Sequence, residues 1–134
     1  MKYNANVWGP HYWFVLHTIA SIYPEHPTNT MKKKYYDFIQ NLPLFIPNED
    51  MGNRLISLLD AYPVSSYLDS KQSFMKWMNF IHNKVNSTNI SYQEGQQSYA
   101  KHYIPPKQVK KRSYTIWIAI LCIAFLTFYI ICNN

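Results

Sequence analysis

Nineteen consecutive residues near the C-terminal end of the chain, positions 114–132, contain no charged side chain. As an α-helix with a rise of about 1.5 Å per residue, such a run spans roughly 28 Å, close to the thickness of a bilayer's hydrocarbon core. Tyr114, Trp117 and Tyr129 lie toward its ends, where aromatic rings prefer the membrane interface. The run predicts a single C-terminal transmembrane helix that anchors the protein in a membrane. A buried core helix is the alternative.

A basic cluster stands directly before this run. Lys107, Lys110, Lys111 and Arg112 supply four of the six net positive charges, so residues 1–106 are close to neutral. Cations beside a membrane span attract anionic headgroups and favour the cytosolic side. We therefore expect a single-pass membrane protein whose N-terminal domain lies in the cytosol. We expect no nucleic-acid partner, because the domain itself has little net charge.

The residues before the linker predict an all-α domain over residues 1–103. Apolar residues recur at intervals of three and four in five segments, and short links that hold prolines join them. Short links favour antiparallel neighbours, so these helices should form a small bundle. Residues 104–113 predict a basic linker, because two adjacent prolines end any helix before them.

A proline and two capping residues predict where three of the helices begin. We expect the first helix over residues 10–23, with Pro10 in its first turn. Asn48 should cap the third helix, and the fourth should begin near Ser70.

The chain has two cysteines, Cys122 and Cys132, and both lie in the apolar run. No disulfide can therefore form within residues 1–103, which agrees with a cytosolic location. The five histidines show no spacing typical of metal ligands, so we expect no metal site.

Two motifs contain more aromatic and polar residues than packing requires. The first is Trp8-Gly9-Pro10-x-x-Trp13-x-x-Leu16-His17, and the second is Trp77-x-x-x-x-His82-Asn83-x-Val85-Asn86. Taken singly, each has a simpler interpretation as helix capping plus core aromatics.

Together, in this order and spacing, the two motifs resemble those of the Erv/ALR family of FAD-linked sulfhydryl oxidases, over residues 7–103. The resemblance implies a four-helix bundle with a short fifth helix that holds FAD, often within a homodimer. Planar rings can sandwich a flavin, while His and Asn offer fixed donors and acceptors. The resemblance assigns cofactor binding to Trp8, Gly9, Trp13, His17, Trp77, His82, Asn83, Val85 and Asn86.

The sequence departs from the family at the redox centre. The family's redox-active Cys-x-x-Cys follows a proline at the start of the third helix, where this chain has Asn48-Glu49-Asp50-Met51. A thiolate at a helix N-terminus is the attacking group in such chemistry, and neither Asn48 nor Met51 supplies one. Arg54 stands where the family often has a histidine.

Our leading hypothesis is therefore a redox-inactive, membrane-anchored relative of these oxidases, with no catalytic residue of its own. It would have a structural, assembly or binding role, in the virion or a virus-associated membrane of a large DNA virus. The alternative is a FAD-linked thiol oxidase that forms disulfides with O2 as acceptor and uses cysteines of a partner protein. Retention of FAD is open at this stage.

Overall fold

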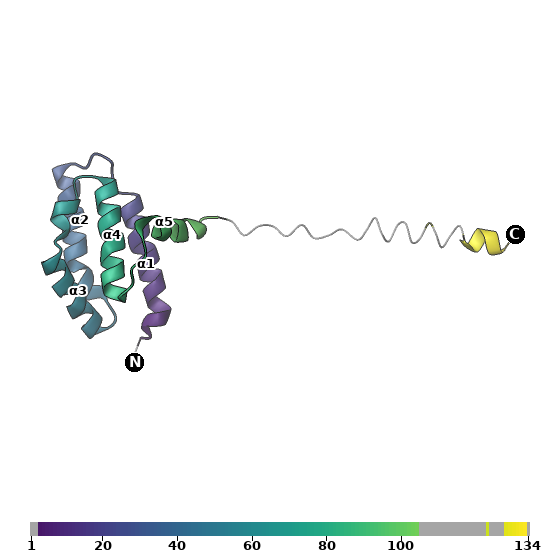
Figure 1. The fold of residues 1–134 in the computed structure, drawn as a ribbon, viewed down its shortest axis with the longest axis horizontal. Helices are drawn as coiled ribbons and strands as arrows, with labels where there is room; N and C mark the ends of the chain where they lie inside the picture. The colour runs from purple at the N-terminus through teal and green to yellow at the C-terminus, as the bar shows by residue number, and fades with distance from the viewer. Residues whose placement is uncertain (1–2, 105–122, 124–127, 134) are drawn as a thin grey trace. The chain divides into compact units, whose positions relative to one another are not determined.

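The computed structural model describes residues 3–104, 123 and 128–133, and its contacts divide the chain into two units, Met1–Ile104 and Pro105–Asn134. The first unit is helical throughout, so the prediction of an all-α fold is confirmed (Figure 1). In chain order its elements are α1 (Ala5–Ser21), α2 (Asn29–Asn41), the 3-10 turn η1 (Leu42–Phe45), α3 (Glu49–Ala61), the 3-10 turn η2 (Val64–Tyr67), α4 (Lys71–Asn86) and α5 (Tyr92–Lys101).

Figure 1 shows α1, α2, α3 and α4 side by side, with the short α5 at an angle to them beside α1 and α4. Among the described residues α4 is the central helix, because it packs on α1, on α3 and on α5. Consequently α4 has side chains on several of its faces that are covered by other helices. The two sequence motifs meet where α1 packs against α4.

The start of α1 differs from the sequence prediction. The helix begins at Ala5, capped by the side chain of Asn4, which accepts a hydrogen bond from the N–H of Asn6. Pro10 therefore lies inside the helix rather than in its first turn. A proline usually forces the preceding residue out of the helical region, because the proline ring collides with that residue's Cβ. Gly9 has no Cβ, so the helix continues through Gly9 and Pro10.

The starts of α3 and α4 agree with the predicted caps. The side chain of Asn48 accepts from the N–H of Met51, and that of Ser70 accepts from the N–H of Ser73. Glu49 and Asp50 occupy the first turn of α3, where negative charge favours the positive end of the helix dipole.

The core is formed by apolar side chains from α1, α2, α3 and α4, together with others from η2 and the connections next to it and to α1. Their polar atoms are satisfied: the buried Tyr23 hydroxyl donates to the Leu68 carbonyl, and Trp77 Nε1 donates to the Tyr62 carbonyl. The buried apolar residues are Leu16, Ala20, Tyr23, Ile39, Leu55, Leu59, Val64, Leu68, Phe74, Trp77, Met78 and Ile81.

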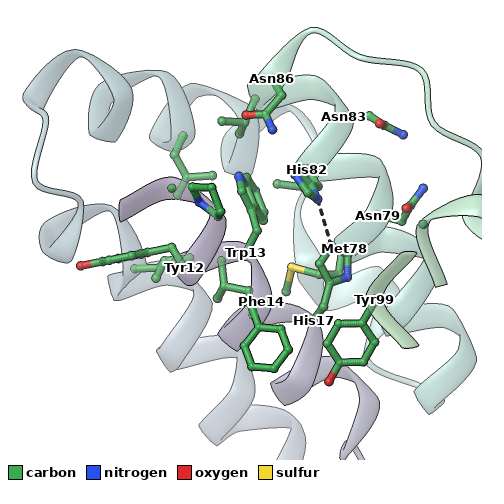
Figure 2. A pocket seen from close by; sticks show the side chains of 18 of the residues that line it. Tyr12, Trp13, Phe14, His17, Met78, Asn79, His82, Asn83, Asn86 and Tyr99 are labelled. Carbon is green, nitrogen blue, oxygen red and sulfur yellow. Dashed lines mark hydrogen bonds between the residues drawn. The ribbon is translucent and has the colours of Figure 1, made fainter. Parts of the chain in front are cut away.

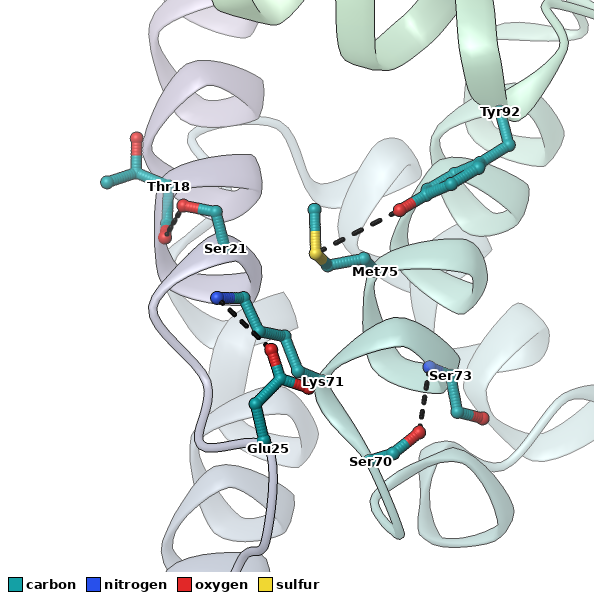
Figure 3. Close-up of polar contacts among 8 residues, drawn as sticks. All are labelled: Thr18, Ser21, Glu25, Ser70, Lys71, Ser73, Met75 and Tyr92. Atoms are coloured by element: carbon teal, nitrogen blue, oxygen red, sulfur yellow. Dashed lines mark hydrogen bonds and ion pairs between the residues drawn. The ribbon is translucent and has the colours of Figure 1, made fainter.

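Polar contacts join the ends of the helices (Figure 3). Lys71, at the start of α4, pairs with Glu25 in the α1–α2 connection at 3.6 Å. The hydroxyl of Tyr92 in α5 approaches the sulfur of Met75 in α4. These contacts fix α4 relative to the elements on both of its sides.

No helix within residues 3–104, 123 and 128–133 is both long and apolar enough to cross a membrane. Most of the predicted span 114–132, and residues 105–113 of the predicted linker, lie outside the described residues.

Candidate functional site

The two motifs meet through a pair of histidines. Nε2 of His17 in α1 lies 2.9 Å from Nδ1 of His82 in α4, a hydrogen bond in which one ring donates and the other accepts (Figure 2). Burial lowers the pKa of His17. Burial and, secondarily, the neighbouring His17 lower the pKa of His82 to about 4. Both rings are therefore neutral at physiological pH.

Trp13 completes this contact. Its indole stacks on the His82 imidazole, with ring centroids 4.0 Å apart and planes 14° from parallel. Offset stacking of this kind holds planar groups at a fixed separation. The stack and the histidine hydrogen bond together join α1 to α4. The three rings involved also border an open space between the helices.

That space is a cavity of about 600 Å³. Its volume falls within the range of roughly 300–1,000 Å³ that small-molecule sites occupy. Figure 2 shows aromatic, His and Asn side chains around it. The sequence-predicted cofactor residues Trp8, Gly9, Trp13, His17, Trp77, His82, Asn83, Val85 and Asn86 all line it.

Two features of this lining point to a ligand. The indole Nε1 of Trp8 is buried but has no hydrogen-bond partner among the described residues. A buried donor left unpaired is unfavourable, so a partner is expected. Apart from its chain neighbours and the backbone of its own helix, a Cβ added to Gly9 would meet no atom within 4 Å, so Gly9 borders open space.

The asparagines and Trp77 have additional structural roles. Both ends of the Asn83 amide are used within the chain: Nδ2 donates to the Ile90 carbonyl, and Oδ1 accepts from the Ile90 N–H and the Thr88 hydroxyl. Asn83 thereby fixes the α4–α5 connection. Asn86 is an exposed residue that borders the cavity, and Trp77 is a core residue that also lines it.

Sequence reasoning missed the contribution of α5 and of Phe14. Tyr99 of α5 and His102 directly after it line the cavity, and both pack on Phe14, with ring centroids 5.6 and 5.4 Å away. The Tyr99 hydroxyl donates to Thr18 Oγ1 on α1. The available signal was Gly95, because a glycine inside a helix often marks close packing. A Cβ there would overlap the Asn79 side chain on α4.

Of the two positions where the family has its cysteines, one lies at this cavity. Met51 lines it and Asn48 caps α3, while Arg54 lies elsewhere, against the end of α4. A thioether has no exchangeable proton, so the cavity lining offers no thiolate. In the part of the chain that the structure describes, no three His, Cys, Asp or Glu side chains come together to hold a metal ion.

Comparison with known proteins places these features in a family. Residues 10–113 match the Erv1/Alr family model. A protein of Acanthamoeba polyphaga mimivirus, described as a probable FAD-linked sulfhydryl oxidase, is 31% identical over 106 residues, which are 75% of this chain and 74% of that protein. A protein of Invertebrate iridescent virus 3, named for the same oxidase activity, is 27% identical over 65% of this chain and 59% of its own length.

The fold comparison agrees. The crystal structure of a double cysteine-to-serine mutant of Erv1 from Saccharomyces cerevisiae superposes with a TM-score of 0.66 and 20% identity, over 72% of this chain and 84% of that one. At this identity the likeness concerns the fold alone.

Proposed function

Because the chain belongs to the Erv1/Alr family, we propose that its cavity binds FAD and that it acts as a FAD-linked sulfhydryl oxidase on thiols supplied by another protein. The observation that carries the proposal is the retained cavity, with the unpaired Trp8 donor on one side and the Trp13–His82 stack on another. The family supplies the cofactor, since the viral relatives named above are FAD-linked by name.

The residues present fit this cofactor. Trp8 offers an unused N–H to a ligand acceptor, and Trp13 offers a ring that already stacks on a planar group. His17 and His82 are neutral, so each exposes donor or acceptor positions without a charge. FAD would supply the two-electron acceptor between thiols and O2. In the overall reaction two thiols lose two electrons and two protons and form a disulfide, and O2 takes them up as hydrogen peroxide.

The chain's own residues would bind and enclose the cofactor rather than attack it. Met51 lines the cavity at a position where the family has a cysteine, and its thioether has no exchangeable proton. The attacking thiolate must therefore come from the substrate protein.

A second function is favoured by one observation, the residues Asn48 and Met51 themselves. Without a thiol in the domain, the protein would be a redox-inactive binding or assembly protein that retains the fold.

One experiment separates the oxidase from the redox-inactive function. It measures oxygen consumption by the purified full chain, loaded with FAD in mild detergent and supplied with a dithiol. Turnover above that of free FAD supports the oxidase. Bound FAD without turnover supports the redox-inactive function. If the protein shows no flavin absorbance band after FAD is added and the sample is desalted, the cavity does not bind FAD at all.

Membrane anchoring belongs to the same proposal. It is supported by the uncharged residues 114–132, from Tyr114 to Cys132, and by the four cations before them. The relatives from large DNA viruses support a place in a virion or a virus-associated membrane. Extraction of expressed protein with alkaline carbonate tests the anchor: a protein recovered in the soluble fraction would contradict it.

We also propose a homodimer. Supporting it, α1 contains no charged residue and exposes Val7 and Val15, and Ile22 directly after it is exposed too, so two copies of a basic chain can meet there without repulsion. Tyr36 and Phe38 of α2 are half-exposed and could extend the contact. Sedimentation equilibrium in detergent would contradict this if it gave a monomer mass at all concentrations.

A further inference from the structure

Arg54 reaches from α3 to the far end of α4. Its guanidinium nitrogen Nη2 donates to the carbonyl oxygen of Lys84 and to the hydroxyl of Ser87, both at 3.0 Å. These residues are 30 and 33 positions further along the chain. The contact therefore fixes the last turn of one helix to the middle of another.

The last turn of α4 is a place where such a contact matters. Ser87 has a left-handed backbone, with φ 56° and ψ 39°, and it is the one non-glycine residue with positive φ in the described part of the chain. Glycine usually occupies this position after a helix, because a side chain disfavours it. The final carbonyls of a helix also lack partners within it and attract positive charge. Arg54 satisfies one such carbonyl and holds the strained serine.

The same turn carries one wall of the cavity. His82, Asn83, Val85 and Asn86 line the cavity from α4, while Met51 lines it from α3. Neither Arg54 nor Ser87 is part of the lining. The arginine thus connects two walls of the cavity from outside it.

We infer that Arg54 is a positioning residue for the cofactor: it sets the affinity for FAD by holding the C-terminal turn of α4, and with it His82 and Asn86, in place against α3. This rests on the proposed binding of FAD. Without the guanidinium, the last turn of α4 loses a partner for a terminal carbonyl and the restraint on Ser87. The turn then frays, and the residues that line the cavity from it no longer keep one position.

The experiment measures FAD binding by flavin fluorescence, using the full chain in mild detergent and FAD itself as the probe. Arg54→Gln should raise the dissociation constant about tenfold, which corresponds to about 1.4 kcal/mol. Glycine adopts the left-handed backbone without strain, so adding Ser87→Gly to Arg54→Gln should bring the dissociation constant back to within about threefold of wild type. Ser87→Gly alone, with Arg54 intact, should leave the dissociation constant unchanged, and this separates a rescue specific to Arg54→Gln from a general gain in stability.

The matched control removes a different exposed contact, away from the cavity. Lys32 of α2 pairs with Asp69, and neither residue lines the cavity. Lys32→Met should leave the dissociation constant for FAD unchanged. A weakening as large as that of Arg54→Gln would mean that general destabilisation explains both, and would overturn the inference.

The remaining outcomes are also decisive. If wild type binds FAD and Arg54→Gln binds it within twofold as tightly, the inference is wrong while the proposed function stands. If Arg54→Gln weakens binding and Ser87→Gly restores nothing, Arg54 does not act through the turn of α4. If wild type does not bind FAD, the proposed function fails, and the inference fails with it.

Discussion

Gly95 of α5 lies directly against Asn79 of α4, so closely that a Cβ on Gly95 would overlap the Asn79 side-chain oxygen. Asn79 is buried and its Nδ2 donates to the Ile90 carbonyl in the α4–α5 connection. The absence of a side chain at Gly95 and the position of the Asn79 amide thus set the distance between α5 and α4. That distance decides whether Tyr99 and His102 reach the cavity.

Replacing Gly95 by alanine should therefore destabilise the protein, although alanine is the better helix former. The overlap forces α5 outward or turns the Asn79 amide, which is buried, and overpacking of this kind costs about 1–3 kcal/mol. We expect the free energy of unfolding, measured with urea and far-UV circular dichroism, to fall by about that amount. Gln97→Ala, on the exposed side of the same helix, should change it little. Equal stability of the two variants would show that α5 does not pack on Asn79 this closely.

A different glycine explains how α1 passes through a proline. Gly9→Ala places a Cβ against the Pro10 ring, and this should lower the free energy of unfolding by about 1 kcal/mol. Adding Pro10→Ala removes the ring and restores the N–H, so the double variant should be at least as stable as wild type. If Gly9→Ala alone is more stable than wild type, the glycine is not what allows the helix to continue.

Acid should destabilise the protein through His82. Its pKa of about 4 lies below the ordinary value of 6.5, so the unfolded chain binds more protons than the folded one between these values. The stabilising contribution is complete above about pH 6.5 and is lost as the pH falls toward 4. The urea midpoint should decrease over this window, and His82→Gln should flatten the decrease. His26→Gln, an exposed histidine after α1, is the control. A wild-type midpoint that is constant from pH 7 to pH 4 would contradict the burial of neutral His82.

Restoring two cysteines tests where thiol chemistry would enter. Asn48→Cys together with Met51→Cys places thiols at the start of α3, where the helix dipole lowers a thiol pKa. If FAD lies beside Met51, dithiol-dependent oxygen consumption should rise at least about a hundredfold, the lower end of what one positioned catalytic side chain contributes. Asn48→Ser, which keeps a capping side chain, should leave the rate unchanged. No gain in a variant that still binds FAD would place the cofactor's reactive end away from α3.

The sequence predicted most where a local pattern decides the structure. Asn48 and Ser70 cap α3 and α4 because their side chains reach an N–H three residues on, a contact that needs no other part of the chain. The predicted start of α1 is wrong because Asn4 caps the helix before Pro10, and Gly9, which has no Cβ, allows the helix to continue through the proline.

The site was only partly predictable, for a different reason. The two motifs marked His17 and His82, but their hydrogen bond joins residues 65 positions apart and depends on the packing of whole helices. The roles of Asn83 in the α4–α5 connection and of Arg54 at the end of α4 also follow from tertiary contacts. No local sequence pattern predicts these two roles.

The separation of His17 and His82 along the chain has a consequence during synthesis. While the N-terminal half is emerging from the ribosome, α1 has no α4 to pack on, and the Tyr99 side of the cavity appears later still. If the cavity binds FAD as proposed, loading must follow completion of the helical unit, because a nascent chain has no formed cavity. Free FAD would then stabilise only the finished fold, by mass action.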